Sequence, residues 1–104
     1  DLKGEGMVHC EDAHVLDIAS YCYVALGLKE DIFVEVMPLE VHGYCYSDGD
    51  VEISDKLEGK ELGIAICHEL THCAQFEANG VSNEEEAYRL EEVLYEEYIN
   101  EKNN

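Results

Sequence analysis

The sequence predicts a small α+β fold, with an N-terminal helix, a short antiparallel sheet in the middle of the chain, and two helices at the end. Apolar residues recur at helical spacing near both ends, and β-branched residues gather in the middle. Residues 47–50 (SDGD) have the composition of a tight turn. A chain of 104 residues has room for one core, so we expect a single domain over residues 1–104.

The first helix is expected over residues 11–28 (EDAHVLDIASYCYVALGL). Its apolar residues repeat every three or four positions, and Gly27 supplies a stop signal. The residues at this spacing are Val15, Ile18, Ala19, Cys22 and Leu26. They predict one helix face that packs against a core.

The middle of the chain favours strands. Residues 32–41 (IFVEVMPLEV) are rich in β-branched side chains and predict a strand that ends near Pro38. Residues 41–46 (VHGYCY) and 51–54 (VEIS) flank the turn at 47–50, so we expect them to form a hairpin. Together these segments predict a small antiparallel sheet.

Two further helices are expected after the sheet. The first covers residues 58–78, because its apolar residues form one stripe and Asn79-Gly80 supplies a stop signal. The stripe consists of Leu62, Ile66, Leu70 and Cys73. The second covers residues 84–98, with a cap at Ser82-Asn83, and leaves residues 102–104 as a tail. Its apolar side carries Ala87, Leu90, Leu94 and Tyr98.

The charge of the chain excludes two classes of partner. The 25 acidic and 6 basic residues give a formal net charge of −19, which repels nucleic acid and anionic lipid. The sequence contains no run of 18 apolar residues that would span a membrane, and residues 1–10 lack the apolar core of a signal peptide. We therefore expect no nucleic-acid partner and no membrane partner, and we favour a cytoplasmic location.

Residues 67–73 (CHELTHC) carry the strongest functional signal. Residues four apart on a helix project from one face, so His68 and His72 can grip a single ion. Two neutral imidazoles leave a divalent metal with open positions for water, and the adjacent Glu69 can take a proton from that water. The motif predicts a Zn²⁺ site with a general base beside it.

Zinc needs a third protein ligand, and no histidine follows His72 in the sequence. The candidates are carboxylates of the last helix. Glu84 borders the apolar side of that helix and is favoured. Glu91 borders the same side and would lie opposite His72 in an antiparallel helix hairpin, so it stays a second candidate.

The segment HELTH, followed by E-x-x-A at the start of the next helix, resembles the gluzincins, the glutamate-ligand branch of the zincin metallopeptidases. The small size resembles the minigluzincins, and the resemblance covers residues 50–98. It implies His68, His72 and Glu84 as zinc ligands. It also implies Glu69 as general base and acid in an endopeptidase that hydrolyses peptide bonds with a zinc-activated water.

Tyr88 departs from this family pattern, because many relatives carry an aspartate or asparagine there that orients a ligand histidine. The hairpin residues His42, Tyr44 and Tyr46 are candidate donors to a tetrahedral oxyanion. A peptide or protein substrate would add to an exposed strand edge. The alternatives are a non-catalytic or latent zinc-binding scaffold or regulator, and a structural domain whose acidic surface meets a basic partner.

The five cysteines include no C-x-x-C pair. Cys67 and Cys73 cannot bridge each other within one helix, because six residues rise ~9 Å whereas a disulfide needs Cα atoms within ~7 Å. We expect reduced, buried thiols, with Cys73 in the core and Cys67 nearer solvent.

Overall fold

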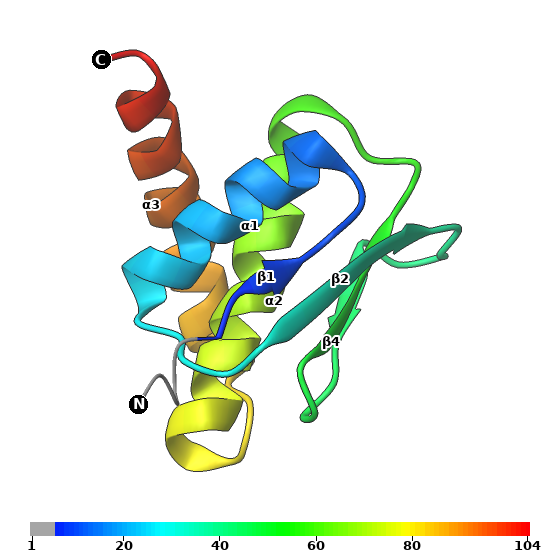
Figure 1. Cartoon of the computed structure of the whole chain (residues 1–104), viewed down its shortest axis with the longest axis vertical. Helices are drawn as coiled ribbons and strands as arrows, with labels where there is room; N and C mark the ends of the chain where they lie inside the picture. Colours follow the sequence, from blue (N-terminus) through cyan, green and yellow to red (C-terminus); the bar gives the residue numbers. More distant parts are fainter. Residues whose placement is uncertain (1–5) are drawn as a thin grey trace.

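A four-stranded mixed sheet and three helices make up residues 6–104, the part of the chain that the computed structural model describes (Figure 1). In chain order the elements are β1 (Val8–His9), α1 (Ala13–Leu26), β2 (Ile32–Met37), β3 (Gly43–Cys45), β4 (Asp50–Ser54), α2 (Gly59–Asn79) and α3 (Glu84–Lys102). The predicted α+β class is confirmed. The N-terminal segment 1–10, which was expected to lack a signal-peptide core, falls partly outside the described residues.

The first helix, Ala13–Leu26, lies within the predicted residues 11–28, and its end at Gly27 was predicted. The Asp12 carboxylate caps α1 by accepting a hydrogen bond from the Val15 N–H at 3.0 Å. Gly27 ends the helix with a φ of 72°, a conformation that glycine adopts without strain. Four residues of the predicted apolar face are buried in the core, and the fifth, Leu26, is partly buried.

The sheet is mixed, so the predicted fully antiparallel sheet is wrong. The strand order is β1-β2-β4-β3, and β2 runs parallel to both β1 and β4. The hairpin of β3 and β4 is antiparallel, as expected. After β2 the chain runs back along the far edge as β3 and then returns as β4 between β2 and β3. β4 therefore lies parallel to β2, and β3 forms the edge of the sheet.

The three helices lie together on one side of the sheet (Figure 1). The strands follow a two-residue alternation, with Ile32 and Val34 of β2 and Val51 and Ile53 of β4 buried toward the core. Helix α2 is central, because it contacts both other helices as well as β3 and β4. Because of this central position, side chains on most sides of α2 are buried.

The last helix is longer than predicted and continues to Lys102, which was expected in the tail. Its final turn is anchored on α1, because the Tyr98 hydroxyl donates a hydrogen bond to Asp17 Oδ2 at 2.7 Å. The Lys102 Nζ lies 2.7 Å from the same oxygen. These contacts and the packing of Ile99 on the core stabilise the last turn of α3, which follows the apolar residues that predicted the helix.

A glycine sets how closely α2 and α3 approach. The Tyr95 ring of α3 lies directly over Gly63 of α2, so a Cβ at that position would overlap the ring. Because this contact lies part-way along both helices, it fixes their separation. The close packing carries the start of α3 toward the histidines of α2.

Within residues 6–104, none of the helices combines the length and the apolar character that crossing a bilayer requires.

Candidate metal centre

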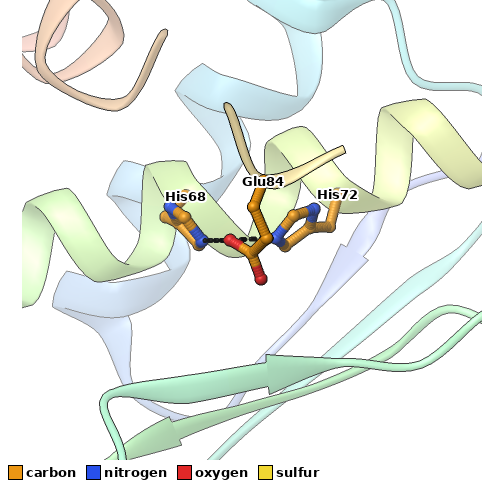
Figure 2. A group of neighbouring side chains, drawn as sticks. All are labelled: His68, His72 and Glu84. Carbon is orange, nitrogen blue, oxygen red and sulfur yellow. Dashed lines mark hydrogen bonds and ion pairs between the residues drawn. The ribbon is translucent and has the colours of Figure 1, made fainter. Parts of the chain in front are cut away.

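Two histidines and a glutamate converge at the junction of α2 and α3. His68 and His72 lie one turn apart on α2, with their ring centroids 4.7 Å apart and the rings nearly perpendicular. Helix α2 ends at Gly80, and Asn83 caps α3 by accepting a hydrogen bond from the Glu86 N–H at 3.0 Å. The turn places Glu84, the first residue of α3, against both imidazoles (Figure 2).

The distances between these side chains fit one metal ion. Glu84 Oε1 lies 3.0 Å from His68 Nε2 and 3.4 Å from His72 Nε2. The three ligand atoms all lie within 4.8 Å of one another. Zinc bonds of ~2.0 to 2.1 Å in a tetrahedron put neighbouring ligand atoms about 3.3 Å apart. The two measured separations lie on either side of that value.

The tautomer of His72 follows from its neighbour Gln75. The Gln75 amide nitrogen donates to the Asn83 carbonyl at 2.9 Å and to Glu86 Oε1 at 2.8 Å. Its oxygen therefore accepts, from the Asn83 N–H at 2.7 Å and from His72 Nδ1 at 2.9 Å. The proton of a neutral His72 thus sits on Nδ1, and the Nε2 lone pair faces Glu84.

His68 has a carboxylate at each of its two ring nitrogens. Glu91 Oε1 lies 2.9 Å from His68 Nδ1, and Glu84 Oε1 lies 3.0 Å from its Nε2. When Nε2 binds a metal, the Nδ1 proton is donated to the Glu91 carboxylate. Glu91, the second candidate for the third ligand, therefore contacts the opposite nitrogen from Glu84. Tyr88, which departs from the family pattern, packs on the His68 ring at a centroid distance of 4.8 Å.

In the tautomers that leave both Nε2 atoms unprotonated, three electron-pair donors point at one position. Two Nε2 lone pairs and a carboxylate oxygen repel one another unless positive charge lies among them. A proton on an imidazole or a metal cation satisfies this arrangement, and separations of 3.0 and 3.4 Å are compatible with either one. The residues present therefore fit zinc, with His68, His72 and Glu84 as its ligands.

Glu69 lies beside these ligands but is much more buried than an ordinary glutamate, with only 6% of its surface exposed. Burial raises the pKa of its carboxyl to about 7. The nearby His72 opposes this rise, whereas the charges of Glu84 and Glu91 add to it. A carboxyl with a pKa near neutrality can both accept and return a proton.

A cleft of about 600 Å³ opens over the site. The helices α2 and α3 contribute Glu69 and the three candidate ligands to its lining, and the edge strand β3 forms another wall. His42 and Tyr44, two of the candidate oxyanion donors, line this cleft. Tyr46 lines a neighbouring hollow instead, and its hydroxyl donates to Glu52 Oε1 at 3.3 Å.

The burial of the two cysteines that flank the motif was predicted correctly for one of them and wrongly for the other. Cys73 is buried, as expected, but Cys67 is 0% exposed, so its predicted position near solvent is wrong. The buried surface of α2 is wider than the stripe read from the sequence, because α1 and α3 both pack against it.

Gln75 was not predicted as part of the site. Its spacing of three residues from His72 on the same helix is the signal that points to it.

No protein-family model, curated protein or solved structure matches this chain. The function is therefore inferred from the chemistry of the site.

Proposed function

We propose that this protein is a small zinc-dependent metallopeptidase with a minimal zincin-like arrangement of the gluzincin type. His68, His72 and Glu84 would hold the zinc, and Glu69 would act as general base and acid. The observation that carries the proposal is the convergence of two imidazole nitrogens and a carboxylate oxygen within 4.8 Å, beside a buried carboxyl in an open cleft.

A bound zinc ion would supply Lewis-acid activation of water and of the scissile carbonyl. Glu69 takes a proton from the attacking water and delivers it to the leaving amine nitrogen. Its buried position beside the three ligands places the carboxyl where it can make both transfers. With both Nε2 atoms on zinc, His72 and His68 would donate their Nδ1 protons to Gln75 and Glu91, which would hold the two rings in place.

The substrate would be an extended peptide that adds to the free edge of β3. An edge strand offers unpaired backbone N–H and C=O groups, and this edge borders the cleft. Val41, Tyr44 and Tyr88 are exposed apolar side chains in the lining, and they would contact the side chains of the peptide. Backbone pairing would then align the scissile bond without a deep pocket.

The alternative is a non-catalytic zinc-binding scaffold with the same fold. Glu69 favours the enzyme, because zinc does not need this residue as a ligand and yet it is buried beside the site.

The substitution Glu69→Gln separates the two functions. We expect the wild-type protein to bind about one zinc and to cleave members of a fluorogenic peptide library. Glu69→Gln should keep the zinc, measured by elemental analysis, and lose cleavage. Glu61→Gln, an exposed glutamate on the same helix, should keep both. Zinc binding without cleavage by the wild type would favour the scaffold, and failure to bind zinc would overturn both functions.

A further inference from the structure

Four of the five cysteines meet in two pairs that the candidate metal centre does not use. Cys22 Sγ lies 3.0 Å from Cys67 Sγ, and Cys45 Sγ lies 2.8 Å from Cys73 Sγ. All are free thiols in the structure, as is the half-buried Cys10, which belongs to neither pair. Sulfur atoms in a disulfide are about 2 Å apart, so each pair would close with a sulfur shift of about 1 Å.

Both pairs join α2 to another element. Cys22 lies on α1, and 45 residues separate it from Cys67. Cys45 is the last residue of the edge strand β3, and 28 residues separate it from Cys73. Cys67 directly precedes the first histidine of the motif and Cys73 directly follows the second. The two contacts therefore attach the metal-binding stretch of α2 to the fold at both ends.

We propose that Cys22 with Cys67, and Cys45 with Cys73, form two structural disulfide bonds when the protein meets a low-molecular-weight disulfide, and that Cys10 remains a thiol. For each bond, one protein thiolate attacks the small disulfide and releases one small thiol. The second protein thiolate then attacks the mixed disulfide and releases the other. Two electrons pass from the protein sulfurs to the oxidant, and the two thiol protons end on the released thiols.

Exposure sets the order in which the bonds form. Cys45 is half-buried, so a soluble oxidant can reach it in the folded protein. Cys22 and Cys67 are both 0% exposed, so their bond requires local opening or formation during folding. Oxidation of the folded protein should therefore link Cys45 to Cys73 first.

The bonds would stabilise the fold without occupying the metal centre. Each closes a long loop and so restricts the unfolded chain more than the folded one. None of the four sulfurs belongs to the metal-ligand cluster found within residues 6–104. The proposal does not depend on the proposed peptidase activity, because the sulfur contacts exist without zinc.

The test is to refold the reduced chain in a glutathione redox buffer that contains a chelator. Free thiols are then counted in denaturant, and a non-reduced digest is mapped by mass spectrometry. We expect the thiol count to fall from five to one, with peptides that pair Cys22 with Cys67 and Cys45 with Cys73, and a higher Tm than that of the reduced protein.

Two variants check the assignment. Cys10→Ser should have no free thiol after oxidation and the same two linked peptides. Cys45→Ser should keep the Cys22–Cys67 link and retain two thiols, at Cys10 and Cys73. The proposal is overturned if the wild type keeps more than one thiol, if Cys10 enters a bond, or if the map shows other pairings. Stable glutathione adducts on the paired cysteines would also overturn it.

Discussion

The contact between Glu91 and His68 gives a quantitative prediction about the candidate metal centre. The carboxylate lies 2.9 Å from His68 Nδ1, and its side chain is 17% exposed, so the hydrogen bond is charge-assisted and partly shielded from water. Glu91→Gln keeps the shape of the side chain but replaces the charged acceptor with a neutral one. The imidazole becomes a weaker donor of its Nε2 lone pair.

Loss of such an outer contact typically weakens metal binding by about 10-fold to 100-fold. This range corresponds to about 1.4 to 2.7 kcal/mol. We therefore expect Glu91→Gln to raise the Kd for zinc by this factor while still binding one ion. The assay is a competition titration with a chromophoric chelator at fixed pH.

Two variants make the titration decisive. Glu92→Gln removes the same charge from an exposed position on the same helix and should change the Kd by less than about 2-fold. Glu84→Gln removes a ligand and should weaken binding more than Glu91→Gln does. If Glu91→Gln instead weakens binding more than Glu84→Gln, Glu91 is the ligand and the roles of the two glutamates are reversed.

Three further predictions follow from the site and its packing. Zinc at 100 times its Kd should raise the free energy of unfolding by about 2.7 kcal/mol. Calorimetry should then show a rise in Tm of roughly 10 to 20 °C, and an unchanged Tm would contradict a bound metal. In metal-free protein the folded pKa of Glu69, about 7, exceeds its ordinary value of 4.5, so the folded state binds more protons between these values. The free energy of unfolding of the wild type, compared with that of Glu69→Gln, should therefore fall by up to about 3 kcal/mol as the pH rises from 4.5 through 7. Urea unfolding at several pH values measures this difference, and a difference that does not change with pH would be inconsistent with a buried Glu69. Gly63→Ala should cost about 1 to 2 kcal/mol in the same assay because the new methyl meets the Tyr95 ring, and it should be neutral or stabilising in a Tyr95→Ala background.

Helices and their ends could be predicted from the sequence because their signals are local. Spacing identified four of the five buried residues of α1 and missed Tyr23, and Gly27 and Gly80 marked two helix ends. The end of α3 was placed too early because its last turn depends on the long-range contact between Tyr98 and Asp17. A periodic pattern carries no information about that partner.

The topology of the sheet could not be predicted in the same way. Local turn composition indicated the β3–β4 hairpin, but the parallel pairing of β2 with β4 leaves no mark on either strand. The strand β1 has only two residues, Val8 and His9, too few for any alternation to be detected. Pairing between distant strands is decided by packing of the whole core.

The part of the candidate site that shares a helix follows from spacing alone, whereas Glu84 on the next helix was favoured over Glu91 without the sequence excluding either. The spacing of His68 and His72 placed both on one face of α2. The choice between Glu84 and Glu91 depended on the turn at Gly80 and on the register of α3 against α2, which the sequence left open. The structure brings Glu84 to both Nε2 atoms and Glu91 to His68 Nδ1.

The most direct test of the central claim is zinc stoichiometry. The wild type, His68→Ala and His14→Ala would be purified without chelator, exposed to zinc, desalted and measured by elemental analysis. His14 is an exposed histidine on α1 and serves as the matched control. A zinc site at the α2–α3 junction predicts about one zinc per chain in the wild type and His14→Ala, and none in His68→Ala. No zinc in the wild type, or equal zinc in all three proteins, would contradict it.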